Sequence, residues 1–202
     1  MTALWIAVGA LVVLLFALLA GAFLALATGR LHLDLGWGRS LHRLGPLQVR
    51  IEAPRELVYE ILSAPYLGRA RNDSIDVLAR GESLVVASHL TKVHFYQART
   101  VEAIELEPPV RMGFRHLTGP VPYAVEQFRL EHHDDETELH YDGELGIDFF
   151  LLGRIAGRRW VVPQWHRAVS EHLAAVKGQA EQRAQRQRAR KAAGGPGPAD
   201  QR

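Results

Sequence analysis

Histidine and carboxylate side chains are the residues of this chain that could do chemistry, because it has ten histidines and no cysteine among 202 residues. The lack of cysteine excludes a thiol nucleophile, a thiolate metal site and a disulfide framework. The run His132-His133-Asp134-Asp135 has metal-binding residue types. However, neighbouring strand residues point to opposite faces, and the run lies at an expected hairpin turn. We therefore predict no metal site and no cofactor.

Motifs of known catalytic machinery are missing from the sequence. It has no Ser-His-Asp ordering, no phosphate-binding glycine loop, no dinucleotide fingerprint and no H-E-x-x-H. No catalytic residue is assigned, and whether the protein is an enzyme stays open, with binding as the main hypothesis.

His116 ends an expected strand whose alternation turns one set of side chains toward the core. Val110, Met112 and Phe114 share its face and are apolar, so His116 could reach an internal cavity. The alternative is a histidine at the end of a strand that is exposed or bonded to a neighbouring loop.

In the next expected strand, VPYAVEQFRLEH, the apolar residues do not keep to one face along its whole length. Tyr123 and Val125 share one face, whereas Phe128 and Leu130 need the other, so we predict a bulge near Glu126. The direction of Glu126 stays open. An inward carboxyl would have a raised pKa and could act as an acid or as a polar anchor for a ligand, while an outward one would be solvated.

The segment from Phe149 to Lys191 has a helical period. Its apolar stripe runs through Leu151, Ile155, Val162, Trp165, Val169, Leu173 and Val176. Pro163 removes one helical hydrogen bond, so we predict a kink there, or a helix that ends near Arg159 and a new one that starts at Pro163. Trp165 and Val169 are expected to face a sheet, and His166 the mouth of a cavity.

A set of aromatic, apolar and titratable side chains is predicted to line a cavity between sheet and terminal helix. Tyr141 joins it because it shares the apolar parity of the last strand, where its hydroxyl could orient a ligand. The predicted lining is Met112, Phe114, His116, Tyr123, Glu126, Tyr141, Trp165, His166 and Val169.

An uncharged apolar run, Leu4 to Ala27, opens the chain. As a helix it would be about 36 Å long, enough to cross a hydrocarbon core of about 30 Å. The alternative is a cleaved signal peptide, because residues 25–27 read A-x-A. Four arginines follow the run closely, so the positive-inside rule places the remainder in the cytoplasm. We predict a single-pass protein of the inner or plasma membrane.

The chain divides into four predicted regions. Residues 1–28 form the anchor, 29–46 a connector, 47–191 one domain and 192–202 a disordered tail. The domain reads as one strand, a short helix, six antiparallel strands and a long helix, which is an α+β order. Basic residues near its end could contact anionic lipids, the alternative being a solvated helix end: Lys177, Arg183, Arg186, Arg188, Arg190 and Lys191. No nucleic-acid partner is expected.

Several phrases carry a resemblance to a known superfamily: IEAPRELVYEIL (51–62), TVEAIE (100–105), GPVPYAVEQFRLE (119–131), ELHYDGELGID (138–148) and AVKGQAEQRA (175–184). The chain resembles the START-like, birch-allergen-like helix-grip superfamily (SRPBCC; polyketide cyclase/dehydrase and lipid-transport proteins), and within it a membrane-anchored bacterial subgroup. The resemblance implies about seven curved antiparallel strands around a long C-terminal helix, preceded here by one transmembrane helix.

Members of this superfamily bind lipids, sterols, hormones, quinones or polyketides between sheet and helix, and some are enzymes. The resemblance therefore implies membrane-tethered binding of a hydrophobic small molecule or lipid. Two alternatives remain: an enzyme of the polyketide cyclase/dehydratase type, and a scaffold protein whose cavity is filled.

Overall fold

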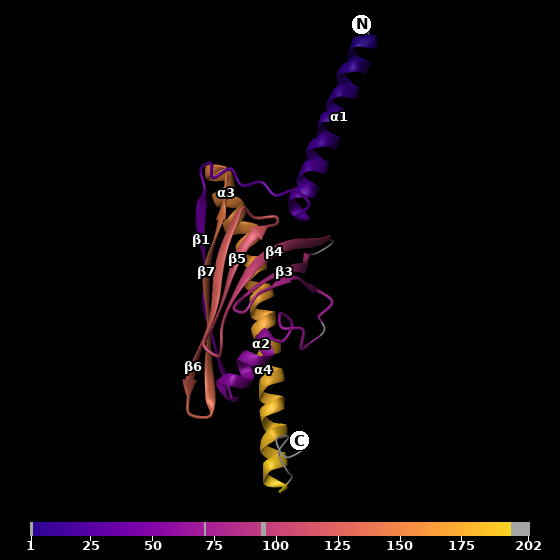
Figure 1. The fold of residues 1–202 in the computed structure, drawn as a ribbon. Helices are drawn as coiled ribbons and strands as arrows, with labels where there is room; N and C mark the ends of the chain where they lie inside the picture. The colour runs from indigo at the N-terminus through magenta and orange to yellow at the C-terminus, as the bar shows by residue number, and fades with distance from the viewer. Residues whose placement is uncertain (1, 71, 94–95, 195–202) are drawn as a thin grey trace.

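A curved antiparallel sheet grips one long helix (Figure 1). The computed structural model describes residues 2–70, 72–93 and 96–194. The strands in this part of the chain are β1 (Ser40–Ile51), β2 (Ile75–Arg80), β3 (Leu84–Val93), β4 (Tyr96–Glu107), β5 (Arg111–Thr118), β6 (Tyr123–His133) and β7 (Glu136–Ile147). The helices are α1 (Thr2–Ala27), α2 (Arg55–Ser63), α3 (Phe150–Ala156) and α4 (Val162–Ala192), with a π-helical turn, η1 (Gly157–Val161), between the last two.

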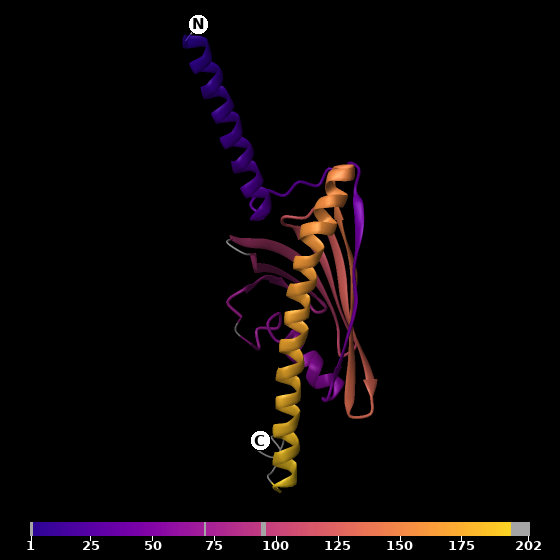
Figure 2. The ribbon, with the colours of Figure 1, turned by 180° about the vertical axis from the view of Figure 1, so that it is seen from behind.

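The strand order confirms the predicted antiparallel α+β architecture. Neighbours run β1-β7-β6-β5-β4-β3-β2, and every pair is antiparallel. The strands from β2 to β7 are neighbours in chain order, and β1 pairs with β7 at the end of this meander. One face of the sheet holds the buried core, and α4 runs along that face (Figure 2).

β1 begins seven residues before the strand predicted from Leu47. A register shift between Leu44 and Leu47 interrupts its pairing with β7, and Gly45 in this shift has a φ of 87° that favours glycine. His42 and Leu44 are buried before the shift, and Ile51 after it. Even-numbered residues therefore face the core before the shift and odd-numbered residues after it. A search for one continuous alternation of apolar and polar residues could not detect the first half of the strand.

The bulge predicted in β6 is wrong. Tyr123 to His133 pair with β7 in continuous register, and the β5 pairing is also unbroken. Ala124, Phe128 and Leu130 are buried, so the even-numbered positions, Glu126 included, face the core. Tyr123 consequently lies on the outer face of the sheet.

The break predicted at Pro163 occurs as η1, a π-helical turn that ends at Val161. Pro163 then lies in the first turn of α4, directly after this irregular turn, which is where the missing N–H of a proline interrupts regular helical bonding. A π-turn adds one residue to the helical repeat and so shifts the phase of the buried stripe. Gly153 and Gly157 are therefore the buried positions, and the predicted stripe members Leu151 and Ile155 are exposed.

The helix α1 is apolar enough to cross a membrane, with a mean hydropathy of 2.8 over Leu4–Ala27 and no burial inside the protein. A signal sequence would meet the same criteria. The connector after it is bonded to the domain. The Arg99 N–H donates to the Thr28 carbonyl at 3.0 Å, and the Leu35 and Gly36 N–H groups each donate to the Asp148 carboxylate at 3.0 Å.

The far end of α4 packs against α2. Ala180 and Ala184 are buried there, so the helix stays packed on the domain beyond Gly178. Arg183 forms an ion pair with Glu60 of α2 at 2.9 Å. Most of the predicted disordered tail, residues 195–202, lies outside the described residues.

Candidate functional site

Three side chains from β6, β7 and α4 meet in the interior of the grip. The Tyr141 hydroxyl donates a short hydrogen bond to Oε2 of Glu126. The Trp165 indole N–H donates to the same oxygen at 3.0 Å and lies 3.1 Å from the Tyr141 hydroxyl. Gly143 pairs with Glu126 across the strands, and a Cβ there would overlap the Glu126 backbone and Cβ. The glycine thus allows β7 to lie close to the base of the glutamate.

Burial shifts the acidity of this group. It raises the pKa of Glu126 to about 7, with a further increase from the nearby charge of Glu102. The hydrogen bonds from Tyr141 and Trp165 oppose the increase, because they stabilise the carboxylate. Glu126 can therefore hold or release a proton near neutral pH, and the pKa of Tyr141 is raised by the same burial, so its hydroxyl stays protonated.

A second carboxyl, Glu102 of β4, faces the interior between two imidazoles. Its Oε2 lies 3.4 Å from Nδ1 of His89 on β3, and its Oε1 lies 3.9 Å from Nδ1 of His116 on β5. The His116 side chain is 1% exposed, and neither ring nitrogen has a hydrogen-bond partner among the described residues. Buried polar atoms are usually satisfied, so a polar group that enters the interior could bond to these nitrogens.

Aromatic rings fill the space around both carboxyls. Tyr66 lies 5.9 Å from Phe114, Phe114 lies 5.6 Å from Phe128, and Phe128 lies 5.2 Å from Tyr141, each between ring centroids. His172 of α4 lies 6.0 Å from Phe128. Burial, and to a lesser extent the charge of His89, lowers the pKa of His172. The interior thus combines apolar walls with a few polar groups, as small-molecule sites do.

The structure brings together six of the nine residues predicted from the sequence. Met112, Phe114, His116, Glu126, Tyr141 and Trp165 point into the grip. Val169 packs at the edge of the core. The other two lie elsewhere: Tyr123 donates to Glu144 at 2.8 Å on the outer face, and His166 accepts the Gly45 N–H of β1 at 3.3 Å.

Sequence reasoning missed Glu102, His89 and His172. The signal for Glu102 was present, because it occupies the same parity as the buried Thr100 and Ile104 of β4. A charged residue between apolar positions of one strand face indicates an inward polar group. His89 lies near Glu102 because β3 and β4 are neighbouring strands.

A hollow of about 660 Å³ lies on the other face of the sheet, away from α4. Its rim carries both signs of charge. Arg111 of the rim bridges Glu105 and Glu107 at 3.1 and 2.6 Å, and Asp142 of the rim contacts Arg129 at 3.3 Å. Because the hollow lies on the outer face of the sheet, it is not the candidate site.

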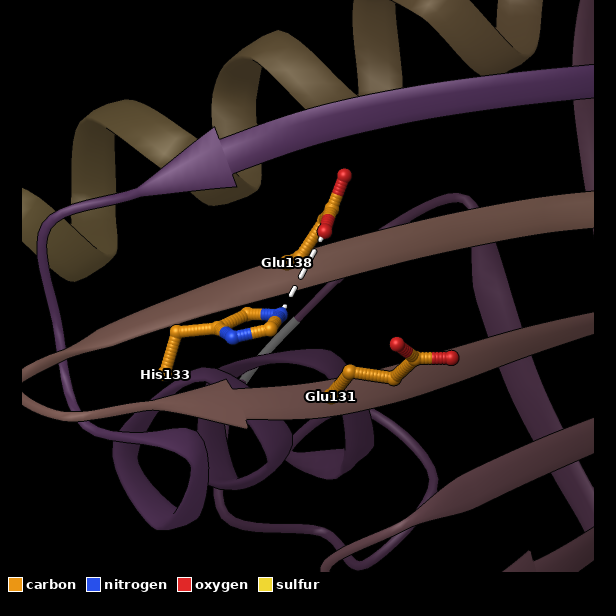
Figure 3. Close-up of side chains that lie close together, drawn as sticks. All are labelled: Glu131, His133 and Glu138. Carbon is orange, nitrogen blue, oxygen red and sulfur yellow. Dashed lines mark ion pairs between the residues drawn. The ribbon is translucent and has the colours of Figure 1, made fainter.

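Glu131, His133 and Glu138 gather at the β6–β7 hairpin and could supply one metal ligand each (Figure 3). Nε2 of His133 lies 3.4 Å from Oε2 of Glu138. Two of the three side chains are exposed, and the ion pair explains the gathering without a metal.

No protein-family model matches the sequence, and no curated protein matches it. Solved structures match the fold. The Zhui aromatase/cyclase from Streptomyces sp. R1128 is similar with a TM-score of 0.58 and 19% identity, over 72% of this chain and 95% of its own. A protein from Thermus thermophilus gives 0.56 and 17% identity, over 70% and 97% of the two chains.

A START superfamily protein from Mycobacterium smegmatis gives a TM-score of 0.50 and 17% identity, over 70% of this chain and 97% of its own. At such identities the likeness concerns the fold. This agrees with the observed strand order and with the position of α4. The chain therefore has the helix-grip fold of the START-like, birch-allergen-like superfamily.

Proposed function

We propose that the protein binds a hydrophobic small molecule or lipid between the sheet and α4, next to a membrane that α1 anchors it to. The observation that carries the proposal is the Glu126 carboxyl, which Tyr141 and Trp165 hold inside an aromatic interior. A buried titratable group is costly unless it has partners, and here it also marks where a ligand's polar end would bind.

Polar and titratable groups lie among the aromatic rings between the sheet and α4. Glu126 accepts from Tyr141 and Trp165, and the buried ring of His116 has no hydrogen-bond partner among the described residues. Buried polar groups without partners are costly in a filled core, so they favour a ligand site over a filled scaffold. The fold shared with an aromatase/cyclase agrees with it.

Native mass spectrometry of the full chain, released from lipid nanodiscs, tests binding. We expect a bound apolar molecule in the wild type and a lower occupancy in Tyr141→Phe, because the ligand's polar end loses a hydroxyl partner. Tyr123→Phe is the matched control, since Tyr123 also donates to a glutamate but on the outer face. Absence of any bound molecule, or equal loss in both variants, would contradict the site.

Acid–base catalysis on such a ligand is the second candidate, favoured by the pKa of Glu126 near 7. A carboxyl of this acidity could remove and return a proton next to a carbonyl group. The test is deuterium exchange at the α-carbon of a hydrophobic ketone in the presence of the protein. Exchange no faster than in buffer, or unchanged in Glu126→Gln, would end this candidate and leave binding untouched.

Membrane anchoring belongs to the same proposal. We propose that α1 spans an inner or plasma membrane once, with the domain in the cytoplasm, because the segment that follows α1 carries four arginines up to Arg50 and only one acidic residue, Asp34. The bonded connector would hold the domain against the bilayer.

A further inference from the structure

A cluster of large apolar side chains is exposed at one end of the domain. This end patch consists of Trp37, Phe149, Phe150, Leu151, Leu152, Ile155 and Trp160. Leu152 is 73% exposed, Trp37 62%, Trp160 57% and Phe150 56%. Monomeric soluble proteins seldom expose so many large apolar side chains together, so the patch indicates a contact with an apolar phase or partner.

The backbone is built to expose these side chains. Gly153 and Gly157, four residues apart, face the sheet, and a Cβ on either would overlap Asp148 or the His42 ring. Because glycines occupy the inward positions, the large residues of α3 and η1 point away from the domain. Phe149 and Phe150 both have positive φ, 76° and 51°, a conformation that is unfavourable for residues with a side chain.

Trp37 of the connector joins the patch to the segment that follows α1. Its ring lies 5.3 Å from Phe150 and 6.4 Å from Phe149, both edge to face. The Phe149 N–H donates to the Trp37 carbonyl at 2.9 Å. The patch is thus continuous with the chain that leaves α1.

Positive charge surrounds the patch. Arg154, Arg158 and Arg159 are exposed on the same helical turns, and the sequence has no acidic residue between Asp148 and Glu171. Tryptophan, leucine and phenylalanine beside arginine are the composition of a helix that lies in the headgroup layer of a membrane.

The position of the patch identifies the membrane concerned. Figures 1 and 2 place α3 and the C-terminal end of α1 at the same end of the domain, and the C-terminal end of α4 at the opposite end. The basic residues of α4 that were predicted to contact anionic lipids belong to the half of the helix that extends away from α1 (Figure 1). The arginines beside the end patch, Arg154, Arg158 and Arg159, are instead at the same end of the domain as α1 (Figure 1).

We propose that the end patch inserts into the interfacial layer of an anionic lipid bilayer, the one in which α1 is anchored. This rests on the proposed anchoring by α1. The domain is then held by two contacts, one through α1 and one through α3 and the connector, and its orientation on the membrane is fixed.

The lack of native cysteines permits a direct test, because one introduced cysteine carries one label. The full chain is reconstituted into vesicles of phosphatidylcholine and phosphatidylglycerol with an environment-sensitive NBD fluorophore at Leu152→Cys. Val110→Cys is the matched control, because Val110 is also apolar and exposed. It lies just before the start of β5, whereas the end of β5 leads to Gly119, which contacts His32 of the connector. Val110 is therefore at the end of β5 that is far from the connector.

We expect the label at 152 to emit at shorter wavelength in vesicles and to be quenched by lipids brominated near the headgroup, while the label at 110 behaves as in water. Arg158→Glu with Arg159→Glu should reduce the wavelength shift in anionic vesicles. The same reversal at Arg186 and Arg190, at the far end of α4, should leave it unchanged.

Flotation with the vesicles separates the two levels of the proposal. If the chain floats with the vesicles but the label at 152 is as exposed to water as the label at 110, insertion of the end patch is overturned and anchoring by α1 is unaffected. A chain that does not float overturns both. A label at 152 that is shielded from water but not quenched by brominated lipid assigns the patch to a protein partner and overturns the lipid assignment.

Discussion

Glu126 is the residue on which the proposed binding site depends, because it is a titratable group held among aromatic rings. Tyr141 and Trp165 both donate to it, so its hydrogen bonds favour the charged form, while burial and the charge of Glu102 favour the neutral form. The second pair of effects is larger. Protein stability should therefore depend on pH through this one side chain.

Glu126→Gln should flatten that dependence. The pKa of Glu126 is about 7 in the folded protein and about 4.5 ordinarily, so between these values unfolding releases a proton. The free energy of unfolding then falls as pH rises through this window, by on the order of 1 kcal/mol per pH unit, and the loss is complete above pH 7. Glutamine cannot ionise and removes the slope.

Thermal unfolding of both proteins, followed by circular dichroism in mild detergent from about pH 5 to pH 8, measures the effect. Glu144→Gln is the control, since Glu144 accepts the Tyr123 hydroxyl on the outer face. Parallel pH profiles for wild type and Glu126→Gln would show that the carboxyl is ionised throughout and not buried as described.

At the scale of elements, the turn η1 determines what the terminal helix presents to the sheet and to the outside. Leu173 and Val176 of α4 are buried, and one extra residue in the π-turn moves the buried phase onto Gly157 and Gly153. Small residues at both positions let the helix lie directly on β1 and β7. The apolar residues between them become the end patch.

Gly157→Ala should separate this turn from the sheet. The new methyl group would overlap the ring of His42, which is buried in β1, and overpacking of this kind costs about 1–3 kcal/mol. Gly178→Ala in α4 is the matched control, since nothing lies within 4 Å of its Cβ position. It should stabilise the protein by about 1 kcal/mol through helix propensity. Chemical unfolding of both variants measures the difference, and equal midpoints would contradict the close contact.

The sequence was sufficient for the elements whose pattern is local. Alternation and turn residues predicted the meander from β2 to β7, and the helical period predicted the terminal helix. The parity of β6 was not local, because Tyr123 and Val125 on one face are as apolar as Ala124 and Phe128 on the other. Continuous pairing with β7 decides between the faces. The change of buried face at η1 could not be predicted for a similar reason. Apolar residues at helical spacing indicate a buried stripe, although here they are exposed.

At the scale of the whole molecule, the proposed anchor α1, the end patch and the edge of the interior near His116 lie at the same end of the domain (Figure 1). The connector after α1 is bonded to β4, to the loop after β5 and to Asp148, so little free chain separates the domain from α1. His32 contacts Gly119 in that loop, and its ring lies 6.2 Å from His116 at the edge of the interior. The polar groups around Glu102 thus face the end of the grip from which a membrane-dissolved ligand would arrive.

This arrangement requires the domain and the N-terminus to lie on opposite sides of the membrane. Arg30, Arg39, Arg43 and Arg50 follow α1 with Asp34 as the only acid among them, so the domain should stay in the cytoplasm. In spheroplasts of a bacterial host, a membrane-impermeant maleimide should label Thr2→Cys directly and Val110→Cys only after lysis. Labelling of Val110→Cys without lysis would reverse the orientation. A mature chain whose intact mass lacks the residues up to Ala27 would show that α1 is a cleaved signal, because a retained anchor must keep every residue of the span.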